Sequence, residues 1–382
     1  MSSTLLTHAH RVDADGEVPD GWLLVEDGRI AATGTGGTPD GHVRIGEVLD
    51  LGGALVVPGF VDLHGHGGGG ASYDDGPEAA RAALAAHRAH GTTRAVLSLV
   101  ARPVEELART LRMVAALAGE DPLVLGSHLE GPWLSPERHG AHEVRHLRAP
   151  LAEDVDALLD AAAGTLRQVT LAPELPGAAA AVDRLVRAGV RVAVGHTETD
   201  AAGAAAAFDA GATLLTHAFN AMPGIHHRAP GPVVAALRDP RVTLEVVLDG
   251  HHVDPALVAV LAAAAPGRLA LVSDAMAGAG APDGGYRLGG LDVLVRGGVA
   301  TLVGGTTIAG STLTLDTALR LAVTEVGLDL ATAVTALTAT PARVLGLDDR
   351  LGRLRPGLAA DLVVLGPALA VEGVWADGRR LR

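Results

Sequence analysis

The chain has 382 residues, 48% of them hydrophobic and 19% charged, so it can bury a large core and is not intrinsically disordered. Thirty basic and 44 acidic side chains give a formal net charge of −14, which argues against nucleic acid and anionic membrane surfaces as partners. There is no cysteine, which excludes disulfides and thiolate ligands, so a metal ion would have to be held by histidine and carboxylate.

The N-terminal residues show no basic segment followed by an apolar core, as a signal peptide would. Apolar runs such as Ala256–Pro266 are too short to cross a bilayer. The sequence therefore predicts a cytoplasmic protein with no membrane partner.

Both ends of the chain have the pattern of β-strands. Gly21–Gly34 places two apolar runs around Glu-Asp-Gly, which is typical of a β-hairpin, and Asp361–Gly366 and Val371–Leu381 look similar. We expect residues 1–55 and 349–382 to pair into one small β-sandwich domain, which also takes in His8, His10 and His42. Two unrelated additions to the chain are the alternative.

Residues 56–348 have a different rhythm, in which apolar, β-branched runs alternate with Ala-rich helical segments. This alternation predicts parallel strands covered by helices, and eight such units predict a (β/α)8 TIM barrel. An open doubly wound sheet is the alternative, but no G-x-G-x-x-G motif follows the first run. The eight runs are Ala54–His64, Thr93–Val100, Pro122–Glu130, Arg167–Glu174, Arg191–Glu198, Ala212–Asn220, Val242–His252 and Leu269–Met276.

Helices are expected between these runs, and a β insert is expected at Tyr286–Gly305. His87 and His90 fall in the first helical segment, where we expect them on the protein surface. The helical segments are Pro77–His90, Pro103–Gly119, Ala178–Gly189, Asp200–Gly211 and Asp254–Ala265.

Histidine and carboxylate side chains stand where the runs end. The carboxyl ends of all strands in a barrel meet at one face, so residues far apart in sequence would come together there. Histidine and carboxylate suit Zn²⁺ or Fe²⁺. The residues are His64, His66, Glu130, His196, His217, Asp249, His251, His252 and Asp274.

Each of these residues also has a plainer interpretation. His64-x-His66 would point to one face of a strand and could hold one ion, but isolated pairs of this kind are often surface residues. Glu130 could pair with Arg138 or Arg145, and His196 and His217 could be hydrogen-bonded core histidines. Asp274 could cap a helix, although beside a metal-activated water it would serve as a general base. The glycines Gly67–Gly70 suit a close approach of the backbone to a sugar or a metal.

Several motifs resemble the N-acetylglucosamine-6-phosphate deacetylase family of the amidohydrolase superfamily, and they run in order along nearly the whole chain. HLEGPW and THAFNAMPG are particular to that family. The segments that carry the resemblance are Pro58–Gly70, His128–His142, Val192–Asp200, Thr216–Gly231, Asp249–Pro255, Val272–Gly280, Gly310–Leu315 and Leu351–Leu365.

The resemblance implies a divalent metal site, with zinc as the expected ion and iron as an alternative. Glu130, His196 and His217 match the ligands of the first ion. His64 and His66 match a position that varies in the family, and the His-x-His form here implies a second ion with Glu130 as the bridge. No lysine ends any of these runs, which agrees with a glutamate bridge.

The resemblance also implies the substrate contacts. Asp274 matches the catalytic aspartate, and His252 matches the histidine that contacts the acetamide carbonyl, although the adjacent His251 leaves open which of the two reaches in. Arg228 matches an arginine that reaches the phosphate from the neighbouring subunit, which implies a homodimer. The remaining matched substrate contacts are Asn220 and Ala221 at the phosphate, and Ala141, Asp249, Ile308, Ala309 and Gly310 elsewhere.

The implied reaction is the hydrolysis of N-acetylglucosamine 6-phosphate to glucosamine 6-phosphate and acetate. A guanidinium suits a phosphate dianion, and Arg228 would supply it inside a strongly acidic chain. Other N-acyl amino sugars or a cyclic amide remain alternative substrates. A non-catalytic scaffold or a purely structural metal site would not need Asp274 beside the ligands.

Overall fold

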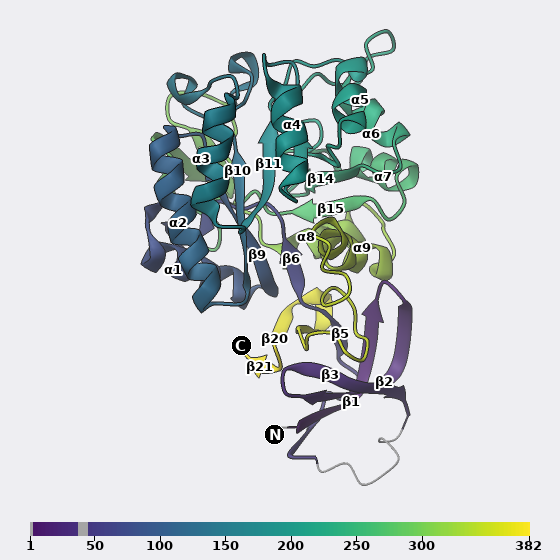
Figure 1. Ribbon diagram of the computed structural model, residues 1–382. Coiled ribbons are helices and arrows are strands. Elements are labelled where there is room, and N and C mark those ends of the chain that lie inside the picture. The colour runs from purple at the N-terminus through teal and green to yellow at the C-terminus, as the bar shows by residue number, and fades with distance from the viewer. Residues whose placement is uncertain (1–2, 37–44) are drawn as a thin grey trace. The chain divides into compact units, whose positions relative to one another are not determined.

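The computed structural model describes residues 3–36 and 45–382 (Figure 1). His42 lies outside the described residues. Within them, the chain divides into two compact units. One contains the residues up to Val61 together with His87–Arg94 and Leu315–Arg382, and the other contains Asp62–Ala86 and Ala95–Thr314.

The two ends of the chain share one sheet. Its order is β21-β20-β19-β5-β1-β2-β3, and β4 also pairs with β1. β4 and β5 run parallel to β1, and the other pairs are antiparallel. The predicted small β domain is therefore confirmed. Its strands are β1 (Ser3–Asp13), β2 (Gly16–Glu26), β3 (Arg29–Thr35), β4 (Glu47–Asp50), β5 (Leu55–Pro58), β19 (Leu362–Leu365), β20 (Val371–Ala376) and β21 (Arg379–Arg380).

The eight apolar runs of the middle region all contribute a strand to a second, parallel sheet. Its order is β15-β14-β13-β12-β11-β10-β9-β6, and just beyond its two edge strands Gly65 pairs in parallel with Ala275. The predicted TIM barrel is therefore confirmed. The strands are β6 (Phe60–Asp62), β9 (Thr92–Val100), β10 (Val124–Glu130), β11 (Leu166–Leu171), β12 (Arg191–Val194), β13 (Leu214–Leu215), β14 (Thr243–Val247) and β15 (Leu269–Val272).

The run Ala54–His64 is two strands and not one. Leu55–Pro58 forms β5 of the terminal sheet, where it pairs with β1 and β19, and Phe60–Asp62 forms β6 of the barrel sheet. His64 and His66 therefore lie just after a strand that ends at Asp62.

Helices follow the barrel strands, as the sequence predicts. α2 packs on β10, α4 on β12 and α6 on β13, and α2, α3 and α4 lie side by side (Figure 1). The helices are α1 (Pro77–Ala89), α2 (Val104–Glu120), α3 (Ala152–Ala162), α4 (Ala178–Arg187), α5 (Ala201–Asp209), α6 (Gly231–Arg238), α7 (Pro255–Ala264), α8 (Leu315–Thr324), α9 (Leu330–Leu337) and α10 (Ala339–Val344).

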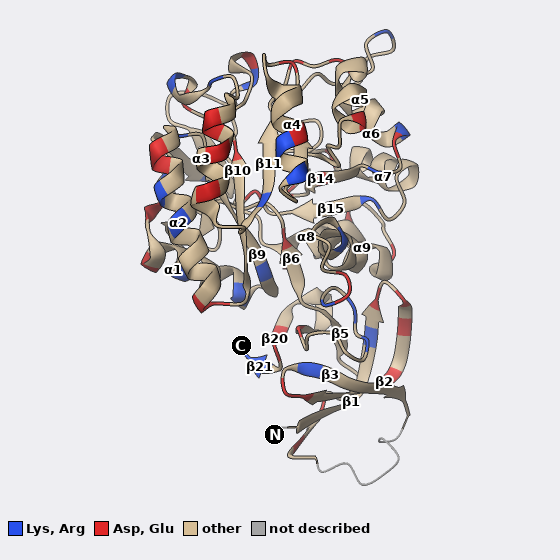
Figure 2. Ribbon diagram, in the orientation of Figure 1, with Lys and Arg blue, Asp and Glu red and all other residues tan. Residues whose placement is uncertain are grey.

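Charged residues sit mainly on helices and loops (Figure 2), and six of the eight barrel strands carry one each, namely Asp62, Arg94, Glu130, Arg167, Arg191 and Glu245. The helix α7 carries no Lys, Arg, Asp or Glu at all. No helix among the described residues combines the length and the apolar character that a membrane span requires.

The expected surface position of His87 is wrong. Its side chain is only 3% exposed, because α1 buries Ala80, Ala83 and Leu84 and the helical repeat puts His87 on the same stripe. His90 follows the end of α1 and is half-buried, with its Nδ1 3.1 Å from the carboxylate of Asp316.

The predicted β insert is a three-stranded antiparallel sheet of β16 (Gly284–Leu288), β17 (Leu291–Arg296) and β18 (Val299–Leu302). Its apolar face forms one cluster with residues of the barrel region, among them Val100, Met276 and Ala309.

Candidate active site

Asp62 ties together the ends of the first and last barrel strands. Its carboxylate accepts hydrogen bonds from the backbone N–H groups of His64 and Ser273, both at 3.2 Å, and from the Ser273 hydroxyl at 2.5 Å. The backbone N–H of Asp274 donates to the carbonyl of His64 at 2.7 Å. His64 and Asp274 are thus fixed next to each other although they are far apart in sequence.

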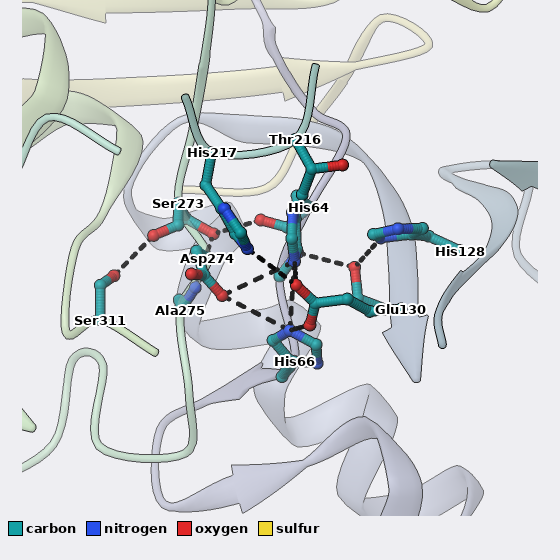
Figure 3. A network of polar contacts seen from close by, with 12 residues as sticks. His64, His66, His128, Glu130, Thr216, His217, Ser273, Asp274, Ala275 and Ser311 are labelled. Atoms are coloured by element: carbon teal, nitrogen blue, oxygen red, sulfur yellow. Dashed lines mark hydrogen bonds and ion pairs between the residues drawn. The ribbon is translucent and has the colours of Figure 1, made fainter. Parts of the chain in front are cut away.

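His64 and His66 turn their Nε2 atoms to the same point, where these atoms lie 3.2 Å apart (Figure 3). Both rings are buried, with exposures of 0% and 1%. The Nε2 atom of His66 is 3.2 Å from one oxygen of Glu130 and 3.4 Å from Oδ1 of Asp274. The buried position excludes the interpretation of the pair as surface residues.

Gly67–Gly70 form a tight turn beside this pair. Gly69 and Gly70 have φ angles of +60° and +88°, which the turn between β7 (Gly67–Gly68) and β8 (Ala71–Ser72) requires. A Cβ on Gly67 would lie 2.3 Å from the Ala71 carbonyl oxygen. The close approach is therefore to neighbouring backbone, and no residue of Gly67–Gly70 lines the cavity described below.

Glu130, the last residue of β10, lies at the centre of several imidazoles. Its carboxylate is 3.0 Å from His196 Nε2, 3.1 Å from His217 Nε2 and 3.3 Å from His142 Nε2. Burial alone would raise the pKa of Glu130, but the surrounding imidazoles, His64 foremost, hold this pKa well below its usual range. The plainer interpretation of Glu130 as an arginine partner is wrong, because Arg138 pairs with Glu198 and Arg145 with Glu143.

The donor arrangement around Glu130 fits a cation. The carbonyl oxygen of Arg138 lies 2.8 Å from His196 Nδ1 and can only accept, so His196 carries a proton on Nδ1. A neutral His196 then turns the lone pair of Nε2 toward an oxygen of Glu130 that is also an acceptor. Two facing acceptors repel each other, and a divalent cation bound by both removes the conflict.

Among the described residues, two groups of side chains have their donor atoms close enough to share an ion. One group is His64, His66 and Asp274, and the other is Glu130, His142 and His196. The Nε2 atom of His217 lies 3.0 Å from that of His196, so His217 adjoins the second group.

Asp274 follows β15 and turns its Oδ1 atom toward His64 and His66, at 3.6 and 3.4 Å from their Nε2 atoms. Burial would raise the pKa of Asp274, but the charge of His64 and the contact with His66 outweigh it, so the pKa lies below its ordinary value. Asp274 does not cap a helix, since no helix starts in the residues that follow it.

Four of the predicted site residues other than glycine have left-handed backbone. The φ angles are +46° at His196, +24° at His217, +50° at Ala221 and +47° at Asp274. Side chains other than glycine adopt this region at a cost, and such positions are concentrated in functional sites. The strand ends thus turn sharply at the residues that face the cavity.

His252 and His251 have different surroundings. His252 Nδ1 is 2.7 Å from Oδ2 of Asp249, whereas His251 is exposed. Burial would lower the pKa of His252, but the hydrogen bond to Asp249 outweighs it and the pKa is raised. Of the two histidines, only His252 lines the cavity.

A cavity of about 360 Å³ opens above these groups. It brings together most of the residues predicted from the sequence, but not Arg228, whose side chain is exposed and lies 2.7 Å from His227 Nε2. Ala309 is fully buried and does not line it either. The predicted residues that do line it are His66, Glu130, Ala141, His196, His217, Asn220, Ala221, His252, Asp274, Ile308 and Gly310.

His142 is part of the site although it was not predicted. It lies on an irregular segment between β10 and α3, its ring meets that of His196 edge-on at 4.7 Å, and its Nδ1 accepts the backbone N–H of Ala101 at 3.2 Å. No strand end marks the position, and the only signal in the sequence is its place at the end of the segment His128–His142.

A comparison with known families agrees with this geometry. Residues 55–381 match the profile of the Amidohydrolase family. This chain belongs to the amidohydrolase family. Amidohydrolases are metal-dependent hydrolases, which agrees with the two groups of donor atoms at the barrel strand ends.

Individual amidohydrolases are similar over most or all of the chain. N-acetylgalactosamine-6-phosphate deacetylase from Escherichia coli O157:H7 is 38% identical over 98% of this chain and 99% of that protein. N-acetylglucosamine-6-phosphate deacetylase from Bos taurus is 36% identical over 87% of this chain and 84% of that protein. A mutant of N-acetyl-D-glucosamine-6-phosphate deacetylase from Mycobacterium smegmatis, solved in complex with N-acetyl-D-glucosamine-6-phosphate, is 45% identical with a TM-score of 0.94 and full coverage of both chains.

Proposed function

We propose that this amidohydrolase hydrolyses N-acetylglucosamine 6-phosphate to glucosamine 6-phosphate and acetate in amino-sugar catabolism. One observation carries the proposal: Glu130, the imidazoles around it and Asp274 converge at one cavity at the ends of the barrel strands. The similar deacetylases, which cover almost the whole length of the chain, support the choice of substrate.

We propose Zn²⁺ as the metal, with iron as the alternative, because the donors are imidazole and carboxylate. Glu130, His196 and His217 would hold one ion. His64 and His66 would hold a second, with Glu130 shared between the two. A bound divalent ion supplies a Lewis acid that polarises the acetamide carbonyl and makes water more acidic.

Asp274 would move the proton. Its low pKa keeps the carboxylate ionised at neutral pH, so that it can accept a proton from the attacking water. The same carboxyl group would then return the proton to the nitrogen of the departing amine. Without this second proton transfer the nitrogen would have to depart as an amide anion, which is a poor leaving group.

His252 would donate a hydrogen bond to the carbonyl oxygen of the acetamide. Asp249 accepts from its Nδ1–H, and the raised pKa favours the doubly protonated ring, whose Nε2–H is then free to donate. A donor fixed in advance stabilises the negative charge that forms on this oxygen in the transition state.

The phosphate would bind at Asn220 and Ala221, with Arg228 supplied by a second subunit of a cytoplasmic homodimer. Arg228 does not line the cavity of its own chain, and a phosphate dianion suits a guanidinium. Ala141, Ile308 and Gly310, which line the cavity, would contact the rest of the sugar.

N-acetylgalactosamine 6-phosphate is the second candidate substrate, favoured by the 38% identity over nearly full length to a deacetylase named for it. The two sugars differ only in the configuration of one hydroxyl, so both satisfy every role assigned above. Another N-acyl amino sugar or a cyclic amide would leave the phosphate contacts unused.

The deciding experiment measures acetate release from both sugar phosphates and from unphosphorylated N-acetylglucosamine, with bound metal determined in the same samples. We expect hydrolysis of at least one 6-phosphate and a much lower kcat/KM for the neutral sugar. A fully metal-loaded protein that releases no acetate from either phosphate would refute the proposal, and equal rates with the neutral sugar would refute the phosphate site.

A further inference from the structure

A buried carboxylate inside the barrel has no part in the chemistry described so far. Glu245 lies on β14 and is 0% exposed. Its Oε1 accepts a hydrogen bond from Gln168 Nε2 at 2.7 Å, and its Oε2 lies 3.4 Å from Nδ1 of His64. A carboxylate is costly to bury without partners, so these two contacts account for its presence in the core.

The contact to His64 has a chemical consequence. A carboxylate can only accept, so the ring must carry its proton on Nδ1 where it meets Glu245. In a neutral imidazole the lone pair is then on Nε2. That atom faces Nε2 of His66 at 3.2 Å, Glu130 at 3.5 Å and Asp274 at 3.6 Å.

We propose that Glu245 is a positioning residue, which fixes the tautomer and the ring orientation of His64 so that Nε2 is available to a metal ion. The inference rests on the proposed function only in taking His64 as a ligand. Histidine ligands commonly donate their other N–H to a carboxylate, and loss of such a partner lowers metal affinity about 10–100-fold.

Glu245 acts on His64 and not on His66, the other proposed ligand of the same ion. Nδ1 of His66 has no hydrogen-bond partner within residues 3–36 and 45–382, so nothing in the described structure fixes the tautomer of that ring. Of the two histidines, only His64 has a hydrogen-bond partner at Nδ1 in the described structure. Gln168, which is also 0% exposed, donates to the other oxygen of the Glu245 carboxylate.

Three variants separate this role from a merely structural one. Glu245→Leu removes the acceptor for His64. Glu245→Gln keeps one acceptor oxygen for His64. Its new amide N–H₂ group can donate a hydrogen bond to Oε1 of Gln168, an oxygen that has no hydrogen-bond partner in the described structure. Gln168→Leu is the matched control, because it removes a buried hydrogen bond at the same place and leaves the contact between Glu245 and His64.

The measurement is a titration of the metal-free proteins with Zn²⁺ against a chelator of known affinity. For Glu245→Leu we expect the second ion to bind about 10–100-fold more weakly and the first ion to be unaffected. Glu245→Gln should recover most of this loss, and Gln168→Leu should bind both ions as the wild type does. A Glu245→Leu protein that holds both ions with wild-type affinity would overturn the inference.

A second measurement determines the tautomer of His64 in the wild-type protein. Wild-type protein labelled with ¹⁵N-histidine and loaded with Zn²⁺ should show His64 with a proton on Nδ1 and the metal on Nε2, with the resonance assigned through His64→Asn. Metal on Nδ1 would overturn the role of Glu245. A wild-type protein that binds a single ion would instead refute the two-ion site of the proposed function.

Discussion

Among single residues, Asp274 offers the most direct test of the mechanism. Replacement by Asn keeps the shape of the side chain and removes its ability to take a proton, so we expect kcat to fall by about 10²–10⁴-fold. The KM should change little, and the ion that we propose at Glu130, His196 and His217 should remain. Steady-state acetate release and metal content measure both, with Asp348→Asn, an exposed aspartate, as the control. Activity within a few-fold of wild type would exclude a proton-transfer role.

His66 should make metal binding depend on pH. Burial lowers the pKa of its ring, but the contacts with Asp274 and Glu130 outweigh burial and raise the pKa to about 9 in the metal-free protein. Below that pH a metal ion has to displace a proton, so the Zn²⁺ affinity should rise with pH, by up to about tenfold per unit for each displaced proton, and level off above about 9.

Competition titrations at several pH values measure this slope. In His66→Asn the second ion should be lost, and the pH dependence of the remaining ion should be shallower. A wild-type affinity that is flat from neutral pH to about pH 9 would contradict the raised pKa of His66.

Which single residues could be predicted depended on where they lie. His196, His217 and Asp274 end apolar strands, so the barrel pattern alone brings them together. His142 lies on an irregular segment, where no periodicity relates a residue to a face. Glu245 lies in the middle of β14. The sequence around an acidic residue inside a strand does not indicate which side chains it will contact.

Among the elements, the strands were more predictable than their ends. A fully buried parallel strand such as β15 is a continuous apolar run, which the sequence displays directly. The run Ala54–His64 is just as continuous, yet it serves two sheets. Which sheet receives each half is decided by backbone pairing with β1 and β19, which are distant in sequence.

The end of β12 gives a prediction at this scale. Gly195 directly precedes His196, and a Cβ there would lie 2.7 Å from the Cβ of Thr216 and 2.8 Å from Cγ2 of Thr170. Neither threonine can retreat easily, since both are fully buried. Gly195→Ala should therefore destabilise the protein by about 1–3 kcal/mol and weaken metal binding by displacing His196.

Thermal unfolding and metal titration measure the two effects of Gly195→Ala. Gly119→Ala is the matched control, because Gly119 lies in α2 and an added Cβ would meet no heavy atom within 4 Å. The control should bind metal normally and gain up to about 1 kcal/mol in stability. Equal behaviour of the two variants would mean that the end of β12 tolerates a side chain.

For the molecule as a whole, composition and element order were enough to predict the two sheets and the site at the barrel strand ends. The domain boundaries at residues 55/56 and 348/349 stay predictions. Composition could not show how a chain with a net charge of −14 would hold a phosphate, because that depends on where single cations lie. Arg228 lies outside the cavity of its own chain, so in the proposed homodimer a partner subunit would supply this cation.

Subunit mixing tests whether Arg228 serves the site of a partner. Asp274→Asn and Arg228→Ala should each abolish or strongly reduce activity alone. In a dimer with one subunit of each variant, the Arg228→Ala subunit keeps its own Asp274 and receives Arg228 from the Asp274→Asn subunit. One of its two sites is then complete. Mixing equal amounts under exchange should then recover roughly a quarter of wild-type activity, because half of the dimers are mixed and each has one working site. If Arg228 serves its own chain, both sites of the mixed dimer are defective and mixing recovers nothing.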